Sequence, residues 1–422
     1  MAEISDIEAY IRDLCVRAKR AAAVLANTPS DKKDLALQFM AEAIRGQADS
    51  LAETNRLDLD AAKQAGLPSA MIDRLTLTPK RIESMAAGID VVRALPDPVG
   101  EVISGTTRPN GLRIFKVRVP LGVIGFIYES RPNVTADAAA LCLKAGNAII
   151  LRGGKEAIHS NVAIVALLRE AAEKAGLNPD SILLVETTDR AAVGHLLKAD
   201  DYVDVIIPRG GESLIRRIAE ESSIPVIKHY AGICHTYVHA DADLDMALEV
   251  CLNAKLQRPG VCNAMETLLV DEVVVADFLP RIIPALQEAG CEVRGDEQVC
   301  ALFPDAPSAV EKDWCTEYLD LILSIAVVPS LDEAISHINT YGSGHSDAII
   351  TQDYAAAMKF VREVDSATVY VNASTRFTDG GEFGMGAEVG ISTDKLHARG
   401  PMGLPELTTY KFVIFGNGQI RE

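Results

Sequence analysis

The feature that most constrains the fold is an alternation of short apolar segments with longer helical patterns in the middle of the chain. The segments that read as strands are AIIL (148–151), SILLV (181–185), DVII (204–207) and PVI (225–227). Strands that alternate with helices form parallel βαβ units, so the sequence predicts an α/β fold with an open, doubly wound sheet. Dinucleotides usually bind at the carboxyl ends of such strands.

Two glycine pairs stand at predicted strand ends. One is Arg152-Gly153-Gly154-Lys155, and the other is Pro208-Arg209-Gly210-Gly211, which leads into a helix. A helix N-terminus preceded by glycines presents free N–H groups to a phosphate. A single Gly-Gly pair is more often a plain turn, but two such loops, each with an arginine, favour nucleotide binding. Neither loop matches G-x-G-x-x-G.

The rest of the chain predicts further regions around this core. Residues 4 to about 95 read as amphipathic helices, and residues 111–119 alternate as an extended arm with one wet face. A second α/β unit follows residue 241, and residues 410–415 form a last strand that pairs with the arm or with a partner subunit. Four segments of the second unit read as strands: TLLV (267–270), ILSIAVV (322–328), AIIT (348–351) and TVYV (368–371).

Composition excludes several classes of protein. A formal net charge of −18 over 422 residues disfavours a nucleic-acid surface, which needs a basic face. The eight cysteines form no C-x-x-C pair, which fits reduced thiols in a cytosol and neither a disulfide framework nor a zinc site. The acidic N-terminus lacks signal-peptide character, and no apolar run reaches the length of a membrane span. We therefore expect a soluble, cytoplasmic protein, and we expect no metal site.

Cys262 is the strongest candidate for chemistry. It follows a Pro-Gly turn, Pro259-Gly260, and precedes a strand-like run. Such a turn exposes backbone amides. A thiol among these N–H donors can ionise and attack a carbonyl carbon, and the same donors can bind the oxyanion that forms. Most free cysteines are simply small buried side chains, so the surroundings must decide between the two interpretations.

Those surroundings resemble the nucleophile loop of the aldehyde dehydrogenase superfamily, with Gln257 five residues before the cysteine. The string QRPGVCNA-x-ET is similar to the gamma-glutamyl phosphate reductases. So are V-x5-AI-x-HI-x-x-YGSGHSDAI (328–349) and FTDGGEFGMGAEVGIST-x-K-x-HARGPMGL (377–404). The resemblance covers essentially the whole chain. It implies an aldehyde-dehydrogenase-like fold and NADPH-dependent reduction of L-glutamyl 5-phosphate to glutamate 5-semialdehyde, the second step of proline synthesis. It also implies a functional link to glutamate 5-kinase and a homo-oligomer.

The resemblance also implies domains and site residues. Residues 1–105 and 120–240 would bind NADPH, 241–403 would carry catalysis, and 106–119 with 404–422 would form an oligomerisation arm. The implied residues are Cys262 as nucleophile, Asn133 as the oxyanion donor, Arg131 and His345 as substrate contacts, Glu317 at the nicotinamide ribose, Arg152, Gly153, Gly154 and Lys155 at the adenosine ribose and its phosphate, and Pro208, Gly210 and Gly211 at the pyrophosphate.

One departure from ordinary aldehyde dehydrogenases concerns the base that hydrolyses the thioester. They carry a glutamate there, whereas VIKHYAGICHTYV places His229 at or near that position. A reductase would waste its acyl-enzyme if it kept such a base. The remaining alternatives are a hydrolytic aldehyde dehydrogenase of the same fold, a cysteine acyltransferase without a nucleotide, and an enzyme that has lost its activity and has a structural or binding role.

Overall fold

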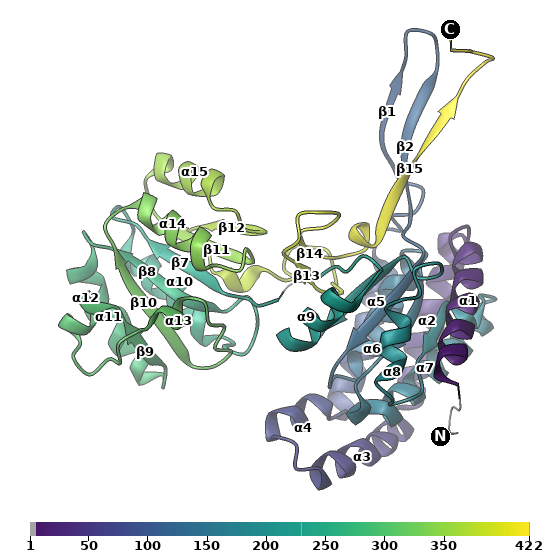
Figure 1. Ribbon diagram of the computed structural model, residues 1–422, viewed down its shortest axis with the longest axis horizontal. Coiled ribbons are helices and arrows are strands. Elements are labelled where there is room, and N and C mark those ends of the chain that lie inside the picture. Colours follow the sequence, from purple (N-terminus) through teal and green to yellow (C-terminus); the bar gives the residue numbers. More distant parts are fainter. Residues whose placement is uncertain (1–5, 229, 422) are drawn as a thin grey trace. The chain divides into compact units, whose positions relative to one another are not determined.

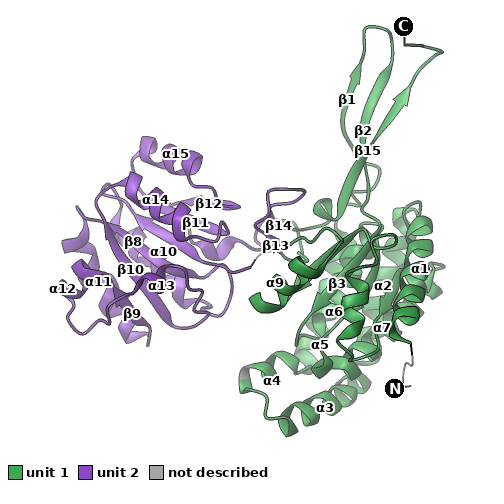
Figure 2. Cartoon of the chain, in the orientation of Figure 1, with its two compact units in different colours: residues 1–228, 384–390, 402–422 green, residues 229–383, 391–401 purple. Residues whose placement is uncertain are grey.

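The computed structural model describes residues 6–228 and 230–421, and the chain forms two compact units (Figure 2). The first unit comprises residues 1–228, 384–390 and 402–422, and the second comprises residues 229–383 and 391–401. The first boundary therefore falls earlier than the expected 240/241. The reason is that strand β7 (Cys234–Val238), which the sequence did not predict, pairs with strands of the second sheet.

The N-terminal region is helical, as predicted. Asp6 caps the first helix by accepting a hydrogen bond from Ala9 N, and Thr78 with Pro79 begins the fifth. Apolar residues at helical spacing, such as Ile11, Leu14 and Ala18, bury one face of the first helix. The helices are α1 (Ile7–Leu25), α2 (Ser30–Gly46), α3 (Ala48–Gln64), α4 (Ser69–Leu75) and α5 (Pro79–Ala94).

The first unit contains a four-stranded parallel sheet in the order β5-β4-β3-β6. All six residues of β3 are buried, so elements cover both faces of the sheet. The segment 225–227, expected as a strand, makes only one isolated bridge, between Val226 and Ile206. The elements are β3 (Val123–Tyr128), α6 (Asn133–Lys144), β4 (Ala148–Arg152), η1 (Lys155–Ala157), α7 (Ile158–Lys174), η2 (Pro179–Ser181), β5 (Ile182–Leu184), α8 (Ala191–Leu196), β6 (Val205–Arg209) and α9 (Glu212–Glu221).

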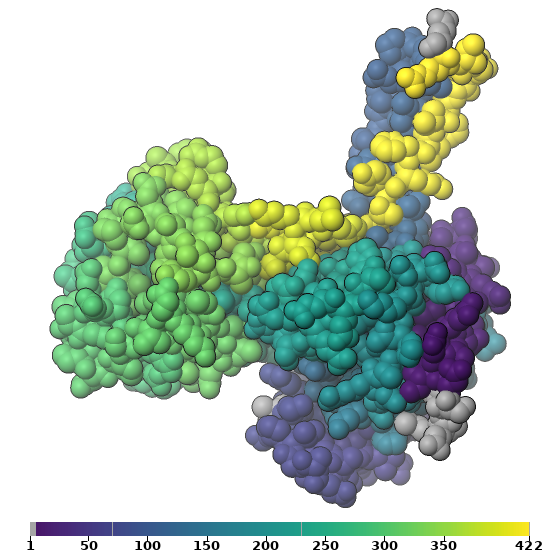
Figure 3. Space-filling model, in the orientation of Figure 1, coloured from purple at the N-terminus to yellow at the C-terminus, as the bar shows by residue number. Residues whose placement is uncertain are grey.

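A separate antiparallel sheet in the order β1-β2-β15 forms the arm. The strands are β1 (Val102–Thr107), β2 (Arg113–Pro120) and β15 (Thr408–Phe415), which follows η4 (Pro405–Leu407). The C-terminal strand lies along the hairpin of the other two (Figure 3), so the last strand pairs with its own chain, one of the two expected arrangements. All of β1 is exposed, and β15 exposes Tyr410, Phe412 and Ile414.

The second unit contains a six-stranded parallel sheet in the order β12-β11-β7-β8-β10-β9 (Figure 1). The four strands predicted here are present, while β7 and β9 were missed. Two short strands, β13 and β14, pair apart from the sheet. The elements after β7 are α10 (Leu244–Leu256), β8 (Met265–Asp271), α11 (Val275–Glu288), β9 (Glu292–Gly295), α12 (Glu297–Leu302), α13 (Glu311–Trp314), β10 (Ile322–Val328), α14 (Leu331–Tyr341), β11 (Ser346–Ile350), α15 (Tyr354–Glu363), β12 (Thr368–Val371), η3 (Thr375–Phe377), β13 (Ile391–Ser392) and β14 (Gly400–Pro401).

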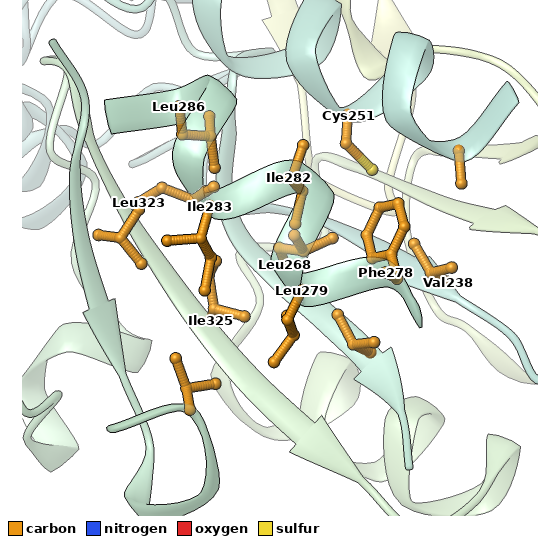
Figure 4. Packing of buried hydrophobic residues seen from close by; sticks show 14 of the residues in the cluster. Val238, Cys251, Leu268, Phe278, Leu279, Ile282, Ile283, Leu286, Leu323 and Ile325 are labelled. Carbon is orange, nitrogen blue, oxygen red and sulfur yellow. The ribbon is translucent and has the colours of Figure 1, made fainter. Parts of the chain in front are cut away.

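The core of this unit lies where α10 and α11 cover the sheet. Phe278, Leu279 and Ile282 on α11 meet Leu268 on β8 and Ile325 on β10, and all five are fully buried (Figure 4). At about 25 cal/mol per Å² of apolar surface, such side chains each contribute roughly 1.5–3 kcal/mol. This packing gives the loop between α10 and β8, which carries Cys262, a rigid support at both ends.

Among residues 6–228 and 230–421, no helix is long and apolar enough to cross a membrane.

Candidate active site and cofactor site

Cys262 lies in the turn between α10 and β8, at the amino-terminal ends of the parallel strands. The neighbouring strands β7 and β11 begin at Cys234 and Ser346, at the same edge of the sheet. Cys262 is half-buried, whereas five of the other cysteines are fully buried. Among the buried ones, desolvation raises the pKa of Cys251 and Cys142, as expected for inert core thiols.

Gly232 packs directly against the backbone of Cys262. A Cβ on Gly232 would lie 1.9 Å from the Cys262 carbonyl oxygen, so no larger residue fits. Gly232 N donates to Glu317 Oε1 at 2.9 Å, and the thiol of Cys234 donates to the same Cys262 carbonyl at 3.2 Å. The structure thus brings Glu317, predicted from the sequence, to the backbone next to Cys262. Gly232 and Cys234 were missed, because only packing reveals them.

His345 is fully buried at the start of β11. Its Nδ1 lies 2.8 Å from Ser346 Oγ and 3.8 Å from Cys234 Sγ. Ser346 Oγ in turn lies 2.7 Å from Thr378 Oγ1, which also contacts the Tyr370 hydroxyl at 2.8 Å. His345 therefore belongs to a buried polar network next to the Cys262 loop, and its contact with substrate stays a prediction.

Charged side chains surround the loop. A fully buried ion pair joins Lys255 Nζ to Glu266 Oε2 at 2.6 Å, and burial raises the pKa of Glu266 to about 7 although Lys255 opposes this. Arg376 lies near Cys262, where burial and the like charge of Arg258 lower the pKa of its guanidinium and a Cys262 thiolate raises it. Sequence reasoning missed Arg376, which is far from Cys262 along the chain.

His337 and His235 pack against neighbouring rings inside this unit. Trp314 packs edge-on against His337 with ring centroids 5.4 Å apart, and His337 meets His235 at 5.6 Å. Burial and His235 lower the pKa of His337 to about 3. Within the described part of the chain, no group of three or more His, Cys, Asp or Glu residues could hold a metal ion. His229 lies outside the described residues.

The first unit has a cavity of about 390 Å³ at the carboxyl ends of β3 and β4 and the start of α9. Three residues predicted to bind a cofactor, Arg152, Gly154 and Lys155, line it together with Arg190 and Arg217, which the sequence did not reveal. The neighbouring pair β3 and β6 is where the strand order reverses, the usual place for a nucleotide in such sheets. Among the described residues, Gly153, Pro208, Gly210 and Gly211 do not line the cavity.

The cavity presents positively charged groups that would suit an anionic ligand. Arg152 Nε is buried and has no hydrogen-bond partner among the described residues, while its Nη1 donates to Gly153 O at 2.7 Å. Burial lowers the pKa of Arg152, a cost that a bound anion would offset. A Cβ on Gly153 would lie 2.1 Å from Asn161 Nδ2, so a larger residue at this position would displace the buried Asn161 side chain.

Two carboxylates hold the loop that follows β3. Glu129 Oε2 accepts from Gly211 N, at the start of α9, at 3.0 Å. Glu156 Oε1 accepts from Ser130 N at 2.7 Å and from its hydroxyl at 2.8 Å. Ser130 has a φ of +52°, a left-handed backbone conformation that residues other than glycine rarely adopt. Glu129 thus lies at the amide that we expected the pyrophosphate to meet.

The two other predicted residues of the first unit follow this loop. Arg131 is exposed, and Asn133 begins α6. Asn133 Nδ2 donates to Asp137 Oδ2 at 3.0 Å, and burial raises the pKa of Asp137 to about 6. The oxyanion role of Asn133 and the substrate role of Arg131 stay predictions.

A half-buried cysteine ahead of a buried strand in one α/β unit, and an arginine-lined cavity at the strand ends of the other, are the arrangement expected of an oxidoreductase of the aldehyde dehydrogenase type. Residues 2–302 and 310–413 match the model of the aldehyde dehydrogenase family. The chain is 58% identical over 406 residues to the gamma-glutamyl phosphate reductase of Moorella thermoacetica, covering 96% of this chain and 97% of that one. It is 54% identical over 416 residues to that of Geobacter metallireducens, covering 99% and 100%.

The crystal structure of the gamma-glutamyl phosphate reductase from Thermotoga maritima superposes with a TM-score of 0.96 at 48% identity, covering 98% of this chain and 100% of that one. An acetylating aldehyde dehydrogenase from Geobacillus thermoglucosidasius, 19% identical, shares the fold with a TM-score of 0.69 over 99% and 100% of the two chains. The chain belongs to the aldehyde dehydrogenase family, in the branch of the gamma-glutamyl phosphate reductases.

Proposed function

We propose that the chain reduces L-glutamyl 5-phosphate to L-glutamate 5-semialdehyde and phosphate with NADPH, through a thioester on Cys262. The observation that carries the proposal is the placement of Cys262: half-buried, backed by the rigid contact with Gly232, and close to Arg376. The names of the close relatives support the same substrate.

In the first step, Cys262 Sγ attacks the C5 carbonyl carbon, and the carbonyl electrons move onto oxygen. Asn133 is our candidate donor to that oxyanion. The C–O bond to the phosphoryl group then breaks, the carbonyl re-forms, and phosphate leaves with the bonding electrons. The product is a thioester, which is more reactive toward a hydride than a carboxylate is.

NADPH, when bound, supplies the hydride that reduces the thioester. We assign Arg152, Gly153, Gly154 and Lys155 to the adenosine ribose and its phosphate, since arginine binds phosphate through a planar fork. Glu317 would hold the nicotinamide ribose, and the segment from Pro208 to Gly211 would lie along the pyrophosphate. When hydride has been transferred, Cys262 leaves as the thiolate and the aldehyde is released.

The units receive matching roles in this proposal. The first unit would bind NADPH, the second would carry the covalent chemistry, and the arm of β1, β2 and β15 would join subunits through its exposed Tyr410, Phe412 and Ile414. The protein would work in the cytoplasm beside glutamate 5-kinase, because an acyl phosphate hydrolyses readily and must be used soon after it forms.

Two other functions fit less well. A hydrolytic aldehyde dehydrogenase needs a carboxylate base at the thioester, where the sequence has His229 or a residue near it. A cysteine acyltransferase without a nucleotide would leave the cavity with Arg152 and Lys155 without a purpose.

The reverse reaction tests the proposal. Purified protein should oxidise glutamate 5-semialdehyde with NADP⁺ only when inorganic phosphate is present, because phosphate must release the thioester. Oxidation that proceeds equally well without phosphate would indicate a hydrolytic enzyme, and no oxidation with either NADP⁺ or NAD⁺ would remove the reductase assignment.

A further inference from the structure

Arg376 lies next to the nucleophile loop and has no role in the mechanism so far. It belongs to η3, and its Nε donates to Gln257 Oε1 at 2.9 Å. Gln257 stands on the same loop as Cys262, directly after α10. This bond uses the Nε side of the guanidinium, and among residues 6–228 and 230–421 no hydrogen bond from its two Nη groups is found, so these N–H donors can meet a ligand.

The backbone of Arg376 is fixed by the residue that follows the nucleophile. Asn263 Nδ2 donates to Arg376 O at 3.3 Å and to Thr378 O at 2.8 Å. In return, Thr375 Oγ1 donates to Asn263 O at 2.7 Å. Asn263 and Thr375 are both buried. Because hydrogen bonds run in both directions between the two loops, the backbone of Arg376 is held at a fixed position relative to the backbone of Cys262.

The electrostatics of this position favour a bound anion. Arg376 is partly desolvated and stands near a second cation, Arg258, which is exposed. Each of these circumstances costs free energy that a neighbouring anion offsets. The chain as a whole has a formal net charge of −18, so the attraction of an anion to this loop depends on nearby cations.

We infer that Arg376 binds the phosphoryl group of the acyl phosphate and stabilises its charge as it departs, an inference that rests on the proposed reaction. The thiolate forms the S–C5 bond. The bond between C5 and the oxygen that bridges C5 to phosphorus breaks, and its electron pair stays on that oxygen, which leaves with the phosphate. Arg376 remains protonated throughout and transfers no proton. Its planar fork matches two phosphate oxygens, and the growing charge strengthens that contact as the bond breaks.

The substrate has a second anionic group, the α-carboxylate, at the far end of the carbon chain from C5. The backbone of Arg376 is hydrogen-bonded to Asn263, the residue directly after Cys262, so the anion that Arg376 meets is the one bonded to the attacked carbon. The phosphoryl group satisfies this condition, and the carboxylate does not.

The test measures KM for inorganic phosphate in the reverse reaction, at fixed saturating NADP⁺ and semialdehyde. Loss of a charge-assisted contact should raise KM for phosphate about tenfold to a hundredfold in Arg376→Gln, with KM for semialdehyde and for NADP⁺ unchanged. Arg376→Lys keeps the charge but not the fork, and should fall between Arg376→Gln and wild type. Arg362→Gln, an equal charge change on the exposed face of α15, serves as the control and should match wild type.

An unchanged KM for phosphate in Arg376→Gln overturns the inference. So does a raised KM for semialdehyde with a normal KM for phosphate, which would assign Arg376 to the carboxylate. These results leave the proposed reaction in place, since the wild type would still depend on phosphate. If the wild type itself does not depend on phosphate, the proposed function fails and the inference falls with it.

Discussion

The buried ion pair between Lys255 on α10 and Glu266 on β8 should be the charged contact on which the second unit depends most. Its atoms lie 2.6 Å apart, and neither side chain is exposed. Glu266→Ala leaves the Lys255 ammonium buried without its partner, which costs about 3–5 kcal/mol. Glu266 Oε1 also accepts from Leu319 N at 3.2 Å, and losing that bond costs about 1 kcal/mol more. We therefore expect Glu266→Ala to lose about 4–6 kcal/mol of stability.

The matched control removes both charges. In Lys255→Met/Glu266→Met no buried charge is left without a partner. Replacing a buried ion pair by apolar residues is often neutral, or it stabilises the fold by about 1–4 kcal/mol. The Leu319 contact is still lost, and Leu319 has a left-handed φ of +55°, so this loop should loosen while the unit stays folded. We expect the double variant to unfold at a urea concentration equal to or higher than the one at which the wild type unfolds.

Urea unfolding followed by the fluorescence of Trp314, the only tryptophan, reports on this unit directly. The slope of the free energy against urea should stay constant, so that a change in midpoint is a change in stability. The reasoning is refuted if Glu266→Ala unfolds at the wild-type midpoint, or if the double variant is the less stable of the two.

Three further predictions concern the cofactor cavity and the response to pH. Arg152→Ala/Lys155→Ala should raise KM for NADPH about tenfold to a hundredfold and leave KM for NADH little changed; equal losses would show that these residues do not contact the phosphate. Glu129→Gln should tighten NADPH binding, measured by titration calorimetry, because its carboxylate no longer competes with phosphate at Gly211 N; weaker binding would contradict this. Burial raises the pKa of Glu266 from 4.5 to about 7, so the folded state binds this proton more tightly than the unfolded chain. Its contribution to stability is therefore largest below pH 4.5 and falls as pH rises to about 7, a dependence that the double methionine variant should lack.

The parts of the fold that sequence predicted are those where pattern and burial agree. ILSIAVV became β10 over its predicted length, and AIIL became the core of β4, because continuous apolar runs suit strands buried on both faces. Strand β7 was not predicted because His235 and Thr236 interrupt its apolar run. His235 sits inside the sheet only because Asp347, far along the chain, accepts at 2.9 Å from its ring nitrogen.

The same limit applies to the candidate site. Cys262 and Glu317 could be proposed from the sequence because each stands in a local string that resembles the family. Arg376 could not, since it reaches the Cys262 loop through a contact with Gln257 that spans 119 residues of sequence. Gly232 is a plain glycine in the sequence, and only the 1.9 Å approach of the Cys262 carbonyl oxygen to the place of a Cβ shows why it is needed.

The most direct test of the account is phosphate release in the absence of NADPH. Enzyme mixed with L-glutamyl 5-phosphate should release at most one phosphate per active site in a burst and then stop, because the thioester on Cys262 forms and waits for reduction. Cys262→Ala should show no burst above spontaneous decay of the substrate. Steady release over many turnovers that depends on Cys262 would reveal a hydrolytic base, and a full burst in Cys262→Ala would remove the covalent mechanism.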